Sequence, residues 1–78
     1  MQIVYLLRCR DLTVYIGCTS NLKARLVRHR RGEIHYTKSR LPVELISFIS
    51  FENKYKAYFF EKYLKSGSGR AFANKRLI

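Results

Sequence analysis

One glutamate, Glu61, stands apart from the other acidic residues of this strongly basic chain. The remaining four acids lie at expected turns or strand ends, whereas Glu61 borders the apolar stripe of an expected helix. A carboxylate at the edge of a core costs free energy unless a cation or hydrogen bonds satisfy it. A surface ion pair with Lys65 is the alternative, and such pairs contribute only about 0.3–0.5 kcal/mol. The pattern therefore favours Glu61 as a ligand of Mg²⁺ or Mn²⁺, because water and substrate phosphate can complete the coordination of such ions.

A guanidinium and an imidazole lie on one face of an earlier expected helix. Arg25 and His29 are four residues apart and are therefore neighbours on the helix surface. Arg25 borders the core-facing side, where its planar fork can hold two oxygens of a phosphate. The alternative for both residues is a solvated basic stripe. The functional interpretation is favoured for Arg25, and the two interpretations stay open for His29.

Two tyrosines, Tyr5 and Tyr15, lie on neighbouring expected strands, where tyrosine is ordinarily a packing residue. Both hydroxyls can reach one site only if the two side chains share a face of the sheet. A two-residue turn would place them on opposite faces, because side chains alternate with a period of two. An odd-length connection, such as residues 11–13, places them together. We therefore expect the longer connection or a bulge.

These residues and their spacing resemble the GIY-YIG endonuclease superfamily. Its paired motif is similar to Ile3-Val4-Tyr5 and Tyr15-Ile16-Gly17, and matching positions follow at Arg25, His29 and Glu61. Ile3 stands where the first glycine of the motif is expected. The resemblance covers nearly the whole chain. It looks closest to small single-domain members related to the N-terminal nuclease domain of the bacterial excision-repair enzyme, excinuclease ABC.

The resemblance implies a divalent-metal-dependent endonuclease that hydrolyses DNA phosphodiester bonds. In this scheme Glu61 holds the metal and Arg25 stabilises charge on the phosphate. Tyr5 or, preferably, Tyr15 takes or relays the proton of the attacking water, and His29 is a second proton carrier. Free tyrosine has a pKa of about 10, so a nearby cation is expected to lower the pKa of the phenol used.

Two smaller assignments complete the predicted site. Gly17 is expected to let the backbone turn tightly out of the second strand. Asn74 is the candidate for an asparagine that the family often places near its metal.

The elements that position these residues are expected in the order strand, strand, helix, strand, helix, helix (ββαβαα). The hydrophobic patterns predict strands over 2–9, 13–17 and 43–51 and helices over 21–31, 54–65 and 70–77. The expected capping residues are Thr19 or Ser20 and Asn53 at helix starts, Gly32 at a helix end, and Ser66 to Gly69 as the segment that ends the second helix. This order predicts an α/β (α+β) fold over residues 1–78, a single domain with a three-stranded antiparallel or mixed sheet flanked by helices.

The charge balance indicates a polyanionic partner. Sixteen Lys and Arg against five Asp and Glu give a net charge of +11, and such a field attracts nucleic acid. The residues expected to contact phosphates are Arg28, Arg31, Lys38, Arg40 and Lys65. Phosphate contacts position DNA without reading its sequence. We therefore expect structure-selective cleavage of branched or single-stranded DNA, linked to repair or recombination.

The sequence also argues against other classes of site. The apolar runs are far shorter than the roughly 20 residues of a membrane span, so no membrane association and a cytoplasmic location are expected. Cys9 and Cys18 lie too far apart across the expected hairpin to form a disulfide. Without a His/Cys cluster they do not make a zinc site either. Both are expected to be free thiols.

Two other functions remain open. One is a non-catalytic basic nucleic-acid-binding module, in which exposed aromatic residues such as Tyr36, Tyr55 or Tyr58 stack on bases. The other is a nuclease component that is active only with a larger protein partner, which supplies its specificity.

Overall fold

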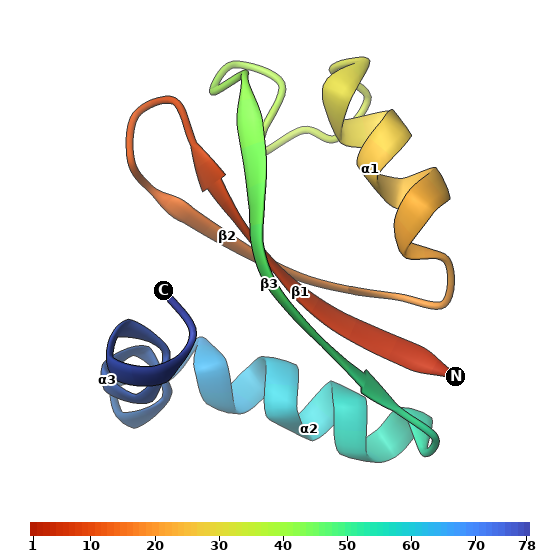
Figure 1. The fold of residues 1–78 in the computed structure, drawn as a ribbon, viewed down its shortest axis with the longest axis vertical. Helices are drawn as coiled ribbons and strands as arrows, with labels where there is room; N and C mark the ends of the chain where they lie inside the picture. The colour runs from red at the N-terminus through yellow and green to blue at the C-terminus, as the bar shows by residue number, and fades with distance from the viewer.

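A computed structural model describes all residues, 1–78, and confirms the predicted α+β fold (Figure 1). The elements are β1 (Gln2–Cys9), β2 (Val14–Thr19), α1 (Leu22–Arg30), β3 (Val43–Phe51), α2 (Lys54–Leu64) and α3 (Gly67–Arg76). The sheet is antiparallel throughout, with the strand order β2-β1-β3. No helix is long and apolar enough to cross a membrane.

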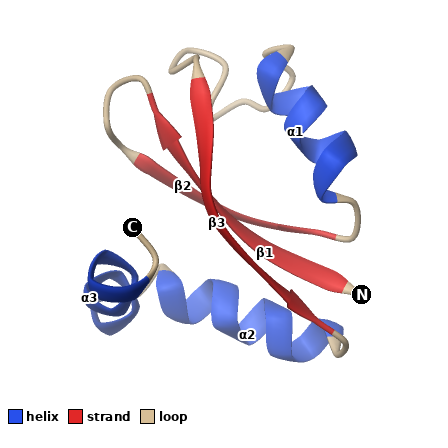
Figure 2. Cartoon of the chain, viewed as in Figure 1, coloured by secondary structure: helices blue, strands red, loops and turns tan.

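The sheet separates α1 on one side from α2 and α3 on the other (Figure 2). Successive side chains of β1 point to opposite faces. Val4 and Leu6 join the main core, which they share with Ala57 and Leu64 of α2. Tyr5 points the other way, toward α1. Four consecutive residues of β1, Val4 to Leu7, are fully buried, as expected for a central strand covered on both faces.

The β1–β2 hairpin has the odd-length connection that the argument about the tyrosines required. Residues 10–12 form it, one residue earlier than the predicted 11–13, so that Tyr5 pairs with Gly17 and Leu7 with Tyr15. The shift arises because the Asp11 carboxylate accepts hydrogen bonds from the Thr13 backbone N–H and hydroxyl, which leaves Thr13 as the first residue of the returning strand. The parity is unchanged, and Tyr5 and Tyr15 share a face.

The expected cap of the first helix is wrong. Asn21, rather than Thr19 or Ser20, caps α1, and its side chain accepts a hydrogen bond from the Ala24 backbone at 3.0 Å. Thr19 remains in β2, where its hydroxyl accepts from the Asn21 N–H. The other local signals are confirmed. Gly32 follows α1 with a φ of 75°, and the Asn53 side chain caps α2.

The last helix begins earlier than predicted. Residues 66–69 were expected to end α2 and leave a helix over 70–77, but α3 already begins at Gly67. Ser66 caps it by accepting a hydrogen bond from the Gly69 N–H. A Cβ at Gly69 would collide with the Tyr63 carbonyl group. The glycine therefore permits a close crossing of two helices rather than breaking one.

Both cysteines are free thiols, as predicted.

Candidate active site

A buried chain of three polar side chains forms the centre of the candidate site. The Tyr5 hydroxyl lies 2.8 Å from His29 Nε2, and His29 Nδ1 lies 2.7 Å from Thr37 Oγ1. All three residues are fully buried. A neutral imidazole has one donor and one acceptor nitrogen, so if one of the two hydroxyls donates to the ring, the other accepts from it. The chain thus links β1, α1 and the segment between α1 and β3.

Tyr15 lies over this buried chain as a partly exposed phenol. Its ring centroid is 6.1 Å from that of Tyr5 and 5.0 Å from that of His29, in an edge-on contact. Its other neighbour is Tyr36, at 5.5 Å. The structure therefore brings Tyr5, Tyr15 and His29 together, and Tyr15 is the one of the three that reaches the surface.

Gly17 makes room for the Tyr5 ring. It lies within β2, directly opposite Tyr5, and the strand continues beyond it to Thr19. The expected tight turn at Gly17 is therefore wrong. A Cβ there would lie 2.6 Å from both Cζ and Oη of Tyr5. Any side chain at this position would push the phenol away from His29.

Burial controls the protonation of the central pair. Loss of water contact raises the pKa of Tyr5 to about 12, the negative charge of Tyr15 adds to the rise, and Arg25 acts in the opposite direction. Burial also lowers the pKa of His29, followed by the positive charges of Arg25 and Arg28. Both groups are therefore neutral near pH 7. The expectation that a cation would lower the pKa of the phenol is wrong for Tyr5, because desolvation outweighs the effect of Arg25.

Arg25 and Glu61 approach the edge strand β2 from opposite sides of the sheet. Both act on the Cys18 thiol of this strand. Burial is the main cause that raises the pKa of Cys18, the Gln2 side chain lowers it by a hydrogen bond, the Glu61 carboxylate raises it and Arg25 lowers it. The edge of β2 at Cys18 is therefore where the guanidinium and the acid come closest to a shared location.

Glu61 is largely covered rather than directed into bulk solvent. Its side chain is 18% exposed, and Lys65 Nζ lies 3.3 Å from its Oε2. The ion pair that the sequence offered as an alternative is thus present. No group of three or more His, Cys, Asp and Glu side chains exists that could hold a metal. A single carboxylate suits Mg²⁺ or Mn²⁺, which accept water and phosphate oxygens, and does not suit a zinc site.

A groove runs along β2 toward α3. Its cavity has a volume of about 320 Å³ and is lined by Thr13, Val14, Ile16, Tyr36, Leu64, Arg70, Ala73, Asn74 and Ile78. An adjoining hollow shares Tyr36 and Arg70 with it and adds Tyr15 and Lys65. Asn74 therefore lies on the wall of this groove, and Glu61 does not line it.

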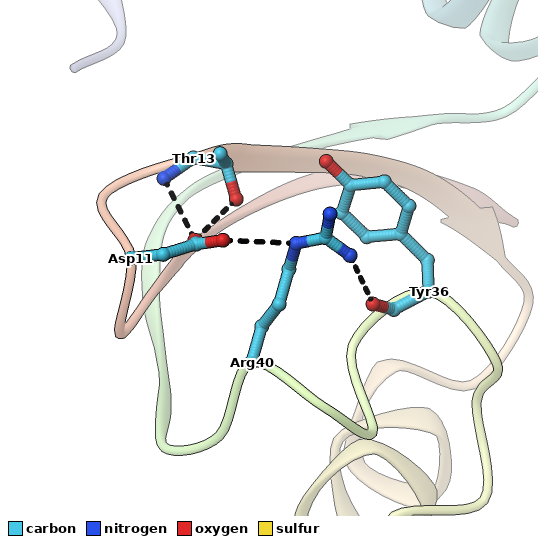
Figure 3. Close-up of polar contacts among 4 residues, drawn as sticks. All are labelled: Asp11, Thr13, Tyr36 and Arg40. Carbon is cyan, nitrogen blue, oxygen red and sulfur yellow. Dashed lines mark hydrogen bonds and ion pairs between the residues drawn. The ribbon is translucent and has the colours of Figure 1, made fainter.

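Arg40 connects the hairpin turn to the segment that carries Tyr36 (Figure 3). Its Nε lies 3.0 Å from Asp11 Oδ2, and its Nη1 donates to the Tyr36 carbonyl oxygen at 2.9 Å. The guanidinium carbon lies 4.2 Å from the centroid of the Tyr36 ring. Arg40 was predicted to bind phosphate, but in the structure these contacts within the protein engage it, and they hold Tyr36 beside Tyr15.

The other predicted phosphate contacts lie on the surface. Arg28 Nε forms an ion pair with Glu33 at 3.5 Å. Arg31 and Lys38 are exposed and form no ion pair. Lys65 is shared between Glu61 and the hollow beside Tyr15.

Sequence reasoning missed Thr37 and did not give Tyr36 a place beside Tyr15. Both follow α1 in a polar, basic segment, where nothing in the local pattern marks a buried hydroxyl. Tyr36 was expected only as an exposed aromatic residue that stacks on bases.

The chain matches known proteins over nearly its full length. Residues 1–76 match the model of the GIY-YIG catalytic domain. A UPF0213 protein of Clostridium perfringens is 44% identical over 66 residues, which cover 83% of this chain and 71% of that protein. A UPF0213 protein of Pediococcus pentosaceus is 52% identical over 54 residues, which cover 68% of this chain and only 57% of that protein.

The fold also matches a solved structure. The solution NMR structure of a UPF0213 protein from Bacillus halodurans is similar with a TM-score of 0.61 and 32% identity, over 95% of this chain and 81% of that one.

Proposed function

The chain belongs to the GIY-YIG catalytic domain family, and we propose that it is a divalent-metal-dependent endonuclease that hydrolyses DNA phosphodiester bonds. The observation that carries this proposal is the layered arrangement of the site. A partly exposed phenol, Tyr15, lies over the buried pair of Tyr5 and His29, with the guanidinium of Arg25 beside them.

Tyr15 is the proposed proton acceptor for the attacking water, because it alone of the three aromatic groups reaches the surface. Tyr5 and His29 hold its ring from beneath. Tyr5, with a pKa of about 12, stays protonated at neutral pH and does not itself act as the base. A proton passed inward has a route from Tyr5 Oη to His29 Nε2, which are 2.8 Å apart. General acid–base catalysis of this kind contributes about 10²–10⁴-fold to a rate.

Arg25 is the proposed partner of the scissile phosphate. It is partly buried, and its planar fork can donate two parallel hydrogen bonds to phosphate oxygens. Its charge already reaches both Tyr5 and His29. A phosphate bound there would therefore lie next to the phenols.

Glu61 is the residue that would hold Mg²⁺ or Mn²⁺. A cation in this place would take over the role of Lys65, whose ammonium now balances the carboxylate. When bound, the ion supplies positive charge for the phosphate and the leaving oxygen. Asn74, across the groove from Tyr36, is a proposed contact for DNA rather than for the metal.

The proposed substrate is branched or single-stranded DNA in repair or recombination. Exposed basic residues bind phosphates irrespective of sequence. The proposed compartment is the cytoplasm, where free thiols such as those of Cys9 and Cys18 are the norm. A protein partner that directs the nuclease to its substrate is compatible with this scheme.

The proposal is tested by nicking of supercoiled plasmid and of branched oligonucleotides, with Mg²⁺, with Mn²⁺ and with a chelator. We expect metal-dependent cutting by the natural chain and a loss of at least about 100-fold in Glu61→Gln, equivalent to ~2.7 kcal/mol. Glu52→Gln, at an exposed acid between β3 and α2, is the matched control and should cut normally. A chain that binds these substrates but never cuts them, or an unimpaired Glu61→Gln, would overturn the proposal.

A further inference from the structure

The outward face of α2 combines aromatic rings with lysines and carries no acid. Its exposed residues, here called the aromatic–lysine face, are Lys54, Tyr55, Lys56, Tyr58, Phe59, Lys62 and Tyr63. Outward faces of helices are normally polar, with apolar residues turned toward the core. Here Phe59 is 64% exposed and Tyr55 62% exposed. The face is therefore unusual both in its apolar area and in its single sign of charge.

The side chains of this face form one continuous surface. Tyr55 is three residues from Tyr58 and four from Phe59, and Lys62 follows at the same spacings, so that each residue is the neighbour of the next on the helix. The rings of Tyr58 and Phe59 have centroids 5.7 Å apart. Lysine ammonium groups lie 5.4 Å from two of the ring centroids, Lys54 over Tyr55 and Lys62 over Tyr58.

Packing of the helix does not account for these aromatic residues. The residues of α2 that are buried against the sheet and α3 are Ala57 and Leu64, with Phe60 partly buried beside them. Phe60 already packs against Phe51 of β3. Tyr55, Tyr58 and Phe59 project away from this core, and exposed apolar patches of this kind mark interaction sites.

We propose that the aromatic–lysine face binds single-stranded DNA, with unpaired bases stacking on Tyr55, Tyr58 and Phe59 and phosphates contacting the lysines. Alternation of aromatic rings and positive charge is how proteins hold single strands, because every base has a π-face and every nucleotide a phosphate. A duplex hides its base faces and cannot use the rings. The absence of exposed acids on the face removes repulsion of the backbone. The choice of DNA over RNA rests on the proposed function.

The face adjoins the candidate active site through one helix. Glu61 lies on the flank of α2 that turns toward β2, and its neighbour Lys62 lies on the outward face. A single-stranded arm bound to the face therefore leaves α2 next to the proposed metal ligand. This arrangement would select substrates in which a single strand meets a duplex, such as flaps and branches.

Binding is measured by fluorescence anisotropy of a labelled oligo-thymidine in the presence of a chelator, so that cleavage plays no part. Removal of a stacking ring weakens binding by about fivefold or more. We therefore expect the double variant Tyr55→Ala/Phe59→Ala to bind about 30-fold more weakly. The matched control is Phe48→Ala, which removes an aromatic residue that is 55% exposed on β3 and should leave the affinity unchanged. Blunt duplex of the same length should bind all three proteins equally.

A second pair of variants separates stacking from loss of structure. Tyr55→Phe/Tyr58→Phe keeps the rings and should bind like the natural chain. Lys54→Gln/Lys62→Gln should lower the slope of log affinity against log salt by about 1.4, because each phosphate contact in a single strand contributes about 0.7. Circular dichroism should show the same helix content in every variant.

Several results would overturn the inference. One is an oligo-thymidine affinity that is unchanged in Tyr55→Ala/Phe59→Ala. Another is a loss in this variant of binding to anionic phospholipid vesicles or to oligo-uridine but not to oligo-thymidine. A chain that binds single strands through this face but never cuts DNA would refute the proposed function alone.

Discussion

Replacing Thr37 with valine removes a single hydroxyl from the buried chain that joins Tyr5, His29 and the segment between α1 and β3. Thr37 is fully buried, and its Oγ1 lies 2.7 Å from His29 Nδ1. Valine has nearly the same shape, so the substitution leaves one buried ring nitrogen without a partner. Such an unsatisfied group costs about 1–3 kcal/mol. In a domain of this size each kcal/mol lowers the Tm by about 4–8 °C, so the Tm should fall by about 4–24 °C.

The same substitution should slow DNA cleavage even where the protein is fully folded. Thr37 fixes which nitrogen of His29 faces Tyr5, and the aromatic cluster under Tyr15 depends on that arrangement. Loss of one hydrogen bond of about 0.5–1.5 kcal/mol corresponds to a two- to tenfold lower rate. The rate should be measured in single turnover at least 20 °C or so below the Tm.

Two comparisons separate this interpretation from a simple packing defect. Thr37→Ser keeps the hydroxyl and loses a methyl group, at a cost of about 0.8 kcal/mol, and should retain the cleavage rate. In a double-mutant cycle, Thr37→Val and Tyr5→Phe should be coupled by more than about 0.5 kcal/mol, since both act on His29. The reasoning would be refuted if the valine variant were as stable and as active as the serine variant, and if the cycle were additive.

Three further predictions concern the glycines and pH. Gly69→Ala should destabilise the fold by several kcal/mol, beyond about 2 kcal/mol in chemical denaturation, because the new Cβ meets the backbone of α2. Gly17→Ala should impair cleavage more than stability, because its Cβ displaces the Tyr5 ring, which can move where backbone cannot. The pKa of His29 is lowered on folding, so its contribution to stability is fully present above the unfolded value of about 6.5 and is lost as the pH falls through the folded value. The denaturation midpoint should therefore drop between pH 8 and pH 5.

Each of these predictions has a matched control. Gly67→Ala, at a helical glycine whose Cβ would meet nothing, should be neutral or stabilise by up to about 1 kcal/mol. Equal effects at Gly67 and Gly69 would contradict the close crossing of α2 and α3. The pH dependence should persist in His35→Gln, at an exposed histidine, and should diminish in His29→Gln. A drop that disappears with His35 instead would show that the buried imidazole is not its source.

Local sequence signals were sufficient for the elements and for the shared face of the tyrosines. The side-chain period of two predicted that Tyr5 and Tyr15 point the same way once the hairpin connection is odd in length. The cap at Asn53 and the glycine at Gly32 were predicted because each acts within one turn of chain. The start of α3 was missed because the reason for Gly69 is contact with another helix, which a local pattern does not contain.

The candidate site was predicted in its members but not in its depth. The apolar run of β1 indicated a strand buried on both faces, and that burial is what raises the pKa of Tyr5. The effect of a nearby cation was overestimated because the balance between burial and Arg25 depends on three-dimensional distances. Thr37 had no signal at all, since a threonine in a polar segment usually faces water. The engagement of Arg40 by Asp11 likewise depends on two segments far apart in the chain.

The most direct test of the central claim compares two neighbouring phenols, Tyr15 and Tyr36, whose rings lie 5.5 Å apart. Single-turnover nicking of plasmid DNA in Mg²⁺ is measured for Tyr15→Phe and Tyr36→Phe, each of which removes one hydroxyl and keeps the ring. The account predicts that Tyr15→Phe loses at least about 100-fold in rate, while Tyr36→Phe remains within about threefold of the natural chain, a difference of ~0.6 kcal/mol. Cleavage by Tyr15→Phe at the natural rate would contradict it.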